Sequence, residues 1–203
     1  MLFRSGIRPI AVGDTLSRVL GKAISKHFHD DFARFFSERG QFGVAIPGGA
    51  EAIVHAARVV LTDNPGWSCL QIDFENAFNK LSRRLIRTQL AEHFPAILPY
   101  FLARYGTHTR LLLRGAPEDA LVWSRTGVQQ GDPLGPFLFS LGLAAITTRA
   151  QAARAGGAPA PLLLTTTYLD DVTICGRHEE SLAFAKDRKS TRLNSSHIPL
   201  SRM

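Results

Sequence analysis

The stretch "TTTYLDDVTICG", residues 165–176, decides how the rest of the sequence is interpreted. Its apolar and β-branched residues predict two short strands, and "LDD" between them predicts a hairpin turn. Asp170 and Asp171 place two mutually repelling carboxylates in that turn. A divalent cation relieves such repulsion, and carboxylate oxygens suit Mg²⁺ or Mn²⁺. A solvated turn without a metal is the ordinary alternative for paired aspartates.

A third carboxylate follows another β-rich run, "WSCLQIDF", residues 67–74. Asp73 lies four residues after Cys69, and Asp171 lies four residues before Cys175. The two strands can therefore lie side by side with their acidic ends together. Three carboxylates there suit two metal ions, the arrangement that phosphoryl transfer to a nucleotide uses. Taken alone, Asp73 also fits a helix cap.

Helices and strands alternate irregularly along the chain, with hairpins, which favours an α+β fold with a mostly antiparallel sheet. The first helix is predicted over residues 14–40, with Asp14 as its N-cap and an apolar face that includes Leu16, Val19 and Leu20. The other helices are predicted over 48–61, 81–94, 95–106, 137–156 and 179–186. The other strands are predicted over 109–115 and 120–127, followed by a turn-rich loop over 128–136.

Composition narrows the class of protein. The chain has 203 residues, 45% hydrophobic and 20% charged, enough for one packed domain or part of a larger one. Its formal net charge of +7 fits a nucleic-acid partner. No apolar run reaches the length of a bilayer span and no signal peptide is visible, so we expect no membrane partner and an intracellular protein, in the nucleus or the cytoplasm. Cys69 and Cys175 lie in apolar runs and are predicted to be reduced core thiols.

Taken in order, the motifs resemble those of reverse transcriptases. "YLDD" at 168–171 resembles the Y-x-D-D motif of that family, and "DFENAF" at 73–78 resembles its first catalytic motif. "GVQQGDPLGPFLF" at 127–139 resembles the motif between them, and its "QGDPLGP" is similar to the non-LTR retrotransposon type. "RPI" at 8–10 and "QFGVAIPGGAEAI" at 41–53 resemble segments that precede the first catalytic motif.

The resemblance implies a polymerase right-hand palm, a mostly antiparallel sheet with packed helices, plus part of the fingers and with the thumb absent. The resemblance runs from about Arg8 to Lys186, and it implies a partial domain over residues 1–186, with a fingers remnant over about 1–62 and the palm over about 63–186. The family element that follows the Y-x-D-D motif and carries a lysine cannot be identified in the sequence.

The resemblance also implies roles for individual residues. Asp73, Asp170 and Asp171 correspond to the catalytic residues and, with the backbone of Phe74, to the ligands of two Mg²⁺ ions, or of Mn²⁺ in their place. The implied nucleotide-binding residues are Arg8, Phe78, Gln130 and Gly131. The implied primer and template contacts are Tyr168, Gly131 and Pro133. Phe78 would lie under the sugar of the incoming nucleotide, which implies a preference for dNTPs.

Several of these side chains also have an ordinary structural interpretation. Phe78 fits a core aromatic at the start of a helix, and Tyr168 fits a strand aromatic packed in the sheet. Arg8 fits a solvated surface arginine. On the helix predicted over 81–94, Arg83, Arg84 and Arg87 fit a solvated face, with contact to template phosphate as the alternative.

Residues 187–203, "DRKSTRLNSSHIPLSRM", differ from the rest of the chain. Apolar periodicity stops there, and Ser, Arg and Asn take over. The first eleven residues resemble the translation of a widely used sequencing-library adapter, so we predict a non-native, disordered tail. A natural basic terminus is the alternative.

The sequence thus favours the RNA-directed DNA polymerase core of a retroelement, a nucleotidyltransferase. Its partners would be an RNA template, a DNA primer and dNTPs, and its oligomeric state stays open. Two alternatives stay open as well: an RNA-directed RNA polymerase, against which Phe78 argues, and a non-catalytic relic that at most binds nucleic acid. Because no thumb is found, we expect the 203-residue chain to be inactive on its own.

Overall fold

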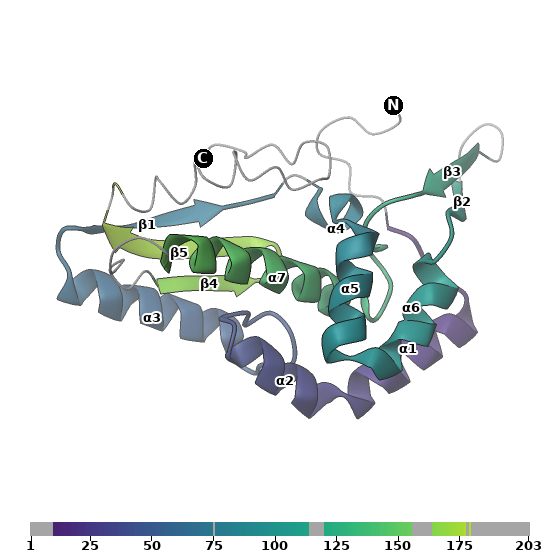
Figure 1. Ribbon diagram of the computed structural model, residues 1–203, viewed down its shortest axis with the longest axis horizontal. Helices are drawn as coiled ribbons and strands as arrows, with labels where there is room; N and C mark the ends of the chain where they lie inside the picture. Colours follow the sequence, from purple (N-terminus) through teal and green to yellow (C-terminus); the bar gives the residue numbers. More distant parts are fainter. Residues whose placement is uncertain (1–9, 75, 114–119, 156–163, 178, 180–203) are drawn as a thin grey trace.

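The computed structural model of the protein describes residues 10–74, 76–113, 120–155, 164–177 and 179. A three-stranded sheet and the helices that flank it form one part of the molecule, and helices alone form most of the other (Figure 1). A two-stranded hairpin projects from the helical part at the end away from the sheet (Figure 1). This is the α+β architecture that the alternation of elements predicted. No helix of the described part is long and apolar enough to cross a membrane.

The larger sheet is antiparallel throughout. It contains β1 (Trp67–Ile72), β4 (Leu164–Tyr168) and β5 (Asp171–Arg177) in the order β1-β5-β4. The central strand, β5, is buried from Val172 to Gly176, as expected for a strand with a neighbour on each edge and helices nearby. All three strands lie where the sequence predicted them.

A single hydrophobic core connects the sheet with the helices. Helix α3 (Gly49–Asp63) packs along β4, β1 and β5, and helix α7 (Gly135–Ala155) packs against α5 (Arg83–His93). The buried residues that join the sheet to α7 include Ile72, Val172, Ile174, Leu138 and Leu141. Phe32 of the helical part stacks on Phe137 of α7, with ring centroids 3.8 Å apart.

The helix predicted over residues 14–40 is two helices, α1 (Thr15–His27) and α2 (His29–Ser37). Asp14 is the N-cap, as predicted, and accepts a 2.8 Å hydrogen bond from the Ser17 N–H. The chain changes direction at Phe28, because α2 has to bury Phe32 and Phe36 in the core whereas α1 buries only Gly21.

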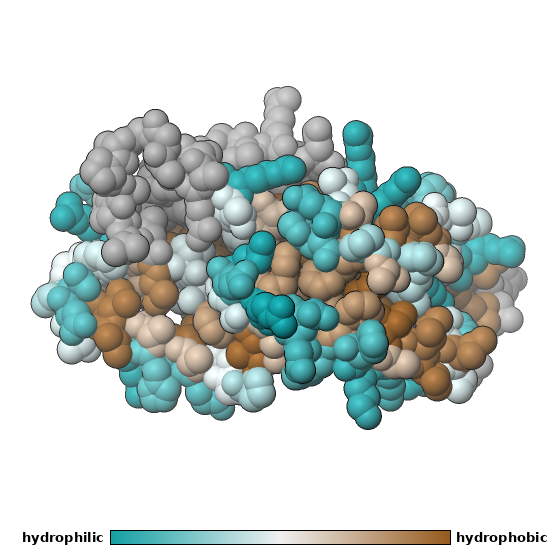
Figure 2. Space-filling view, turned by 60° about the horizontal axis from the view of Figure 1, so that its bottom comes forward, coloured by the Kyte–Doolittle hydropathy of each residue, from teal (hydrophilic) through white to brown (hydrophobic). Residues whose placement is uncertain are grey.

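The apolar face of α1 reaches the core only at its C-terminal end, where Ile24 packs against it. Leu16, Val19 and Leu20 are 77%, 58% and 49% exposed. Hydrophobic surface gathers at the end of the molecule that α1 and α6 (Leu98–Tyr105) form (Figure 2). Helical periodicity therefore identified the apolar residues of α1, but it did not predict that Leu16, Val19 and Leu20 are exposed.

Between the first strand and α7, the predicted helix over 81–94 is confirmed, the helix predicted over 95–106 is a short 3-10 helix followed by an α-helix, and α4 (Ala77–Lys80) was not predicted. The elements there are α4, α5, the short 3-10 helix η1 (Pro95–Ile97) and α6. The predicted hairpin is β2 (Thr109–Leu113) with β3 (Ala120–Ser124), paired antiparallel. Of the helix predicted over 179–186, only Glu179 is described, and the tail over 187–203 lies outside the described residues.

The two cysteines form a cross-strand pair rather than two core thiols. Cys175 is buried in β5, but Cys69 on β1 is exposed, so the prediction was wrong for Cys69. Their register positions face each other, and the Cys175 thiol donates to the Cys69 sulfur over 2.9 Å. Burial, together with the neighbouring Cys69 thiol, raises the pKa of Cys175 to about 12.

Replacing Phe32 tests whether the stacked phenylalanines hold the helical part together. Phe32→Ala should lower the free energy of unfolding by about 3–5 kcal/mol, because it empties a fully buried aromatic site. Urea unfolding followed by circular dichroism measures the change, and Leu16→Ala, at a 77% exposed position, is the control. Equal midpoints for the two variants would contradict the assignment of the core.

Candidate active site

The pairing of β1 with β5 brings two carboxylates to one end of the sheet. Cys69 lies opposite Cys175, and the last residue pair is Ile72 opposite Val172. Asp73 directly follows Ile72 in the sequence, and Asp171 directly precedes Val172. The register therefore puts both at the end of the sheet where β1 ends and β5 begins, and this end of β1 faces α4 in Figure 1. The spacing of cysteines and aspartates in the sequence predicted this arrangement.

The turn between β4 and β5 contains only Leu169 and Asp170, flanked by the pair Tyr168 and Asp171. Leu169 has φ +52°, a left-handed conformation that residues with a side chain rarely adopt. Tyr168 is 40% exposed, so its interpretation as an aromatic packed in the sheet was wrong. The turn therefore presents Tyr168 and Asp171 to solvent, with Asp170 half-buried between them.

Asp73 is half-buried and does not cap a helix. The nearest helix, α4, begins at Ala77 with Asn76 at its cap position, and Ser82 caps α5. The helix-cap interpretation of Asp73 was therefore wrong. Asp73 lies at the end of the sheet, beside the turn that carries Asp170 and Asp171.

The acidic end of the sheet suits a cation whose coordination is completed by other groups. Among the described residues, no three His, Cys, Asp or Glu side chains are grouped closely enough to hold a metal ion by themselves. Mg²⁺ is usually held by one or two carboxylates, with waters and substrate phosphates as the other ligands. Asp73 and Asp171, at neighbouring strand ends, with Asp170 in the turn, are an all-oxygen donor set of that kind.

Two phenylalanines follow Asp73. Phe74 is buried, with 8% exposed, and its backbone lies directly after the carboxylate. Phe78 on α4 is half-buried, and its ring stacks on Phe139 of α7 with centroids 4.4 Å apart and planes 13° from parallel. One face of the Phe78 ring therefore packs on the core, as its structural interpretation predicts. The side chain as a whole remains partly exposed.

The loop that precedes α7 packs against α4 and against the segment near the N-terminus. Val128 donates a 2.7 Å hydrogen bond to the Phe78 carbonyl, and Ala11 donates a 2.8 Å bond to the Gln130 carbonyl. Gly131 has φ +116°, and a Cβ there would lie 2.6 Å from the Ala11 carbonyl oxygen, so only glycine fits. Arg8 itself lies outside the described residues.

Pro133 packs on α1. It therefore has a structural contact in addition to the primer and template contact that the sequence predicted. A Cβ built on Gly21 of α1 would lie 3.4 Å from the Pro133 Cβ. Gln130 is half-buried and Gly131 is exposed. The exposed part of this loop is therefore the Gln130–Gly131 end, next to Ile10.

A buried carboxylate that the sequence reasoning missed holds this loop in place. Asp132 is 5% exposed and accepts hydrogen bonds from the hydroxyls of Tyr100 and Tyr105 and from the Leu134 N–H. Burial, and then the charge of Asp132, raise the pKa values of Tyr100 and Tyr105 well above their usual range. Its place in "QGDPLGP" was the only signal that could have identified Asp132.

Arg83 corrects the prediction of a solvated arginine face on α5. Its guanidinium donates to the Gly127 carbonyl and to the Ser124 hydroxyl, both over 2.8 Å, and lies over the Tyr105 ring. Arg84 and Arg87 are exposed, as predicted. Arg83 therefore ties α5 to the hairpin and to the loop before α7.

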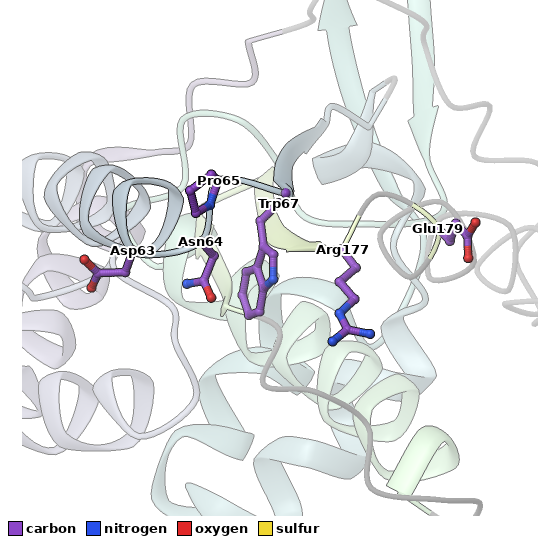
Figure 3. A pocket seen from close by; sticks show the side chains of 7 residues that line it. Asp63, Asn64, Pro65, Trp67, Arg177 and Glu179 are labelled. Carbon is purple, nitrogen blue, oxygen red and sulfur yellow. The ribbon is translucent and has the colours of Figure 1, made fainter.

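The open pocket at the other end of the sheet is not part of this site. Asp63, Asn64, Trp67, Arg177 and Glu179 line it, together with Pro65 and Gly66. Figure 3 shows Trp67 and Arg177 side by side at its centre, where β1 begins and β5 ends. The carboxylates lie at the opposite end of these strands.

A family model described as "Reverse transcriptase (RNA-dependent DNA polymerase)" matches residues 4–202, which extends beyond the range covered by the sequence motifs. No curated protein matches the chain significantly.

Solved telomerase structures share the fold. Apo telomerase from Candida tropicalis superposes with a TM-score of 0.60 at 12% identity, over 91% of this chain and 34% of that one. Telomerase from Candida tropicalis in complex with a TWJ fragment of telomeric RNA superposes with a TM-score of 0.59 at 11% identity, over 88% of this chain and 31% of that one. The chain thus spans about a third of these telomerase chains, and the likeness shows an α+β polymerase fold.

Tyr105→Phe tests the buried carboxylate network. It removes a donor to Asp132, so we expect the free energy of unfolding at pH 7 to fall by about 1–3 kcal/mol. In the native protein, stability should decline above pH 10, because the folded tyrosines resist an ionisation that the unfolded chain undergoes near a pKa of about 10. Tyr105→Phe should make that decline shallower.

Urea titrations at pH 7 and above pH 10 measure both effects. Tyr168→Phe, at an exposed position, is the matched control and should leave both values unchanged. A Tyr105→Phe protein as stable as the native one would show that Asp132 does not depend on the tyrosine hydroxyl.

Proposed function

Because this chain belongs to the reverse transcriptase (RNA-dependent DNA polymerase) family, we propose that it is the core of an RNA-directed DNA polymerase from a non-LTR retrotransposon. The proposed reaction is two-metal nucleotidyl transfer, which adds dNTPs to the 3′ end of a primer. The β1–β5 register carries the proposal, since it places Asp73 beside the turn that holds Asp170 and Asp171.

The carboxylates are proposed as ligands of divalent cations. Asp73, Asp170 and Asp171, with the backbone carbonyl of Phe74, would hold two Mg²⁺ ions, and triphosphate oxygens and water would complete their coordination. When bound, the ions activate the attacking hydroxyl and stabilise the leaving oxygen. The half-buried Asp73 and Asp170 concentrate negative charge at the end of the sheet, where a cation lowers their mutual repulsion.

Phe78 is proposed to select the sugar of the incoming nucleotide. Its ring is backed by Phe139, so it cannot easily move away from a 2′-hydroxyl. A fixed ring beside the sugar therefore favours dNTPs over rNTPs. The same feature argues against the alternative of an RNA-directed RNA polymerase.

The remaining proposed contacts involve the loop before α7, the segment near the N-terminus and the β4–β5 turn. Gln130 and Gly131 are proposed to contact the incoming nucleotide, with Arg8 as a donor to its triphosphate. Tyr168, exposed beside Asp171, is proposed to contact the primer end, with Gly131 and Pro133 near the template. A solved relative in complex with telomeric RNA supports an RNA partner. The formal charge of +7 is in accord with a polyanion.

Asp170→Asn tests the proposed reaction in a full-length enzyme that carries this domain. The change keeps the shape of the turn but removes a metal-binding charge, so primer extension should fall at least about a hundredfold. Asp30→Asn, at a fully accessible carboxylate on α2, is the control and should extend primers normally. Extension that survives Asp170→Asn would refute the site, and native protein that binds primer–template without extending it would favour the non-catalytic alternative.

Phe78→Val tests sugar selection in the same enzyme. The smaller side chain leaves room for a 2′-hydroxyl, so the ratio of kcat/KM for dNTP over rNTP should fall about tenfold or more. Single-nucleotide incorporation with matched dNTP and rNTP measures the ratio. If Phe78→Val lowers both rates equally, the ring is part of the core only.

A further inference from the structure

The turn that carries Asp170 and Asp171 begins with a strained residue. Leu169 has φ +52° although it is large and branched, and glycine is the residue that usually occupies this conformation. A residue held in this way needs surroundings that fix its backbone, because an extended conformation would otherwise be more favourable.

The side chain of Gln41 bonds both backbone groups of Leu169. Its amide oxygen accepts from the Leu169 N–H over 2.9 Å, and its amide nitrogen donates to the Leu169 carbonyl over 3.2 Å. The same oxygen accepts from the Gly43 N–H over 2.9 Å. Gln41 is 1% exposed, so water does not compete for these bonds.

The chain around Gln41 is shaped to bring it against the hairpin. Thr167 donates a 2.7 Å hydrogen bond to the Gly40 carbonyl, and Phe42 donates a 2.8 Å bond to the Thr167 carbonyl. A Cβ on Gly43 would lie 2.6 Å from the Leu169 nitrogen, so a larger residue would push the turn away. Segment 40–43 therefore fits the β4–β5 turn closely and from one side.

We propose that Gln41 is a positioning residue, which holds the Leu169 turn in its left-handed conformation and thereby fixes Asp170 and Asp171 relative to Asp73. Its catalytic meaning rests on the proposed function. To bond both backbone groups of Leu169, a side chain needs an acceptor and a donor in one planar group at the length of glutamine. Glutamate keeps the acceptor and loses the donor, and methionine keeps the volume and loses both.

Gln89 on α5 provides the matched control. It is also buried, with 9% exposed, but within the described part of the chain its side chain makes one hydrogen bond, a 3.4 Å contact with Glu92 on its own helix. A glutamine that merely fills the core should respond to methionine as Gln89 does. A positioning residue should alter the turn and the carboxylates specifically.

The experiment compares Gln41→Met, Gln41→Glu and Gln89→Met in the 203-residue chain. Amide hydrogen exchange by NMR reports on Leu169, and β5 amides report on the sheet. We expect exchange at Leu169 to accelerate about tenfold or more in Gln41→Met and less in Gln41→Glu, with β5 unchanged. Gln89→Met should leave Leu169 as in the native protein. Gln41→Glu serves if Gln41→Met does not fold.

Mn²⁺ titration, followed by paramagnetic broadening at Asp170, gives a second readout. Gln41→Met should weaken Mn²⁺ binding about tenfold. Adding Leu169→Gly should restore much of it, because glycine adopts a positive φ without strain. A packing role would predict no such rescue.

The possible outcomes test the inference about Gln41 and the proposed function separately. Unchanged exchange at Leu169 in both Gln41 variants would overturn the inference, as would equal effects of Gln41→Met and Gln89→Met on Mn²⁺ binding. If the native chain bound no Mn²⁺ even in the presence of a dNTP, the proposed metal site would fail, and the exchange data alone would then decide whether Gln41 holds the turn.

Discussion

The antiparallel register between β1 and β5 is the constraint on which the candidate site depends. It sets Ile72 opposite Val172, so that the next residue on each side is an aspartate. A shift by one residue would turn the side chains of a strand to the opposite face and move Asp73 away from the turn. The buried central strand prevents such a shift, because Val172 and Ile174 are fixed in the core on one side of the pairing.

Around this register the molecule supports the site from two directions. On one side, segment 40–43 lies against the β4–β5 turn and bonds its strained residue. On the other side, the loop before α7 is held by a buried carboxylate and by Arg83. The two supports come from the helical part, so the sheet and the helices form one functional unit through their common core.

Sequence reasoning succeeded where the determinants are local or follow from spacing. The strands, the hairpin turn and the approach of Asp73 to Asp171 came from periodicity and from two equal intervals. It failed where a residue's role depends on a distant partner. Gln41 and Leu169 are 128 positions apart, and Asp132 meets tyrosines on another helix. The break at Phe28, the exposure of Cys69 and the hydrogen bonds of Arg83 to Gly127 and Ser124 likewise depend on tertiary packing that no local pattern records.

The order of the strands has a consequence for biosynthesis. Within the described residues, β5 is the only strand that pairs with β1 or β4, and it is the last of the three to be translated. The helices can form as they leave the ribosome, but the sheet cannot close until Arg177 has emerged. Contacts so distant along the chain slow folding and leave apolar strand edges uncovered for longer. The three-stranded sheet of this protein therefore closes late in synthesis, after the helices that precede β5 have emerged.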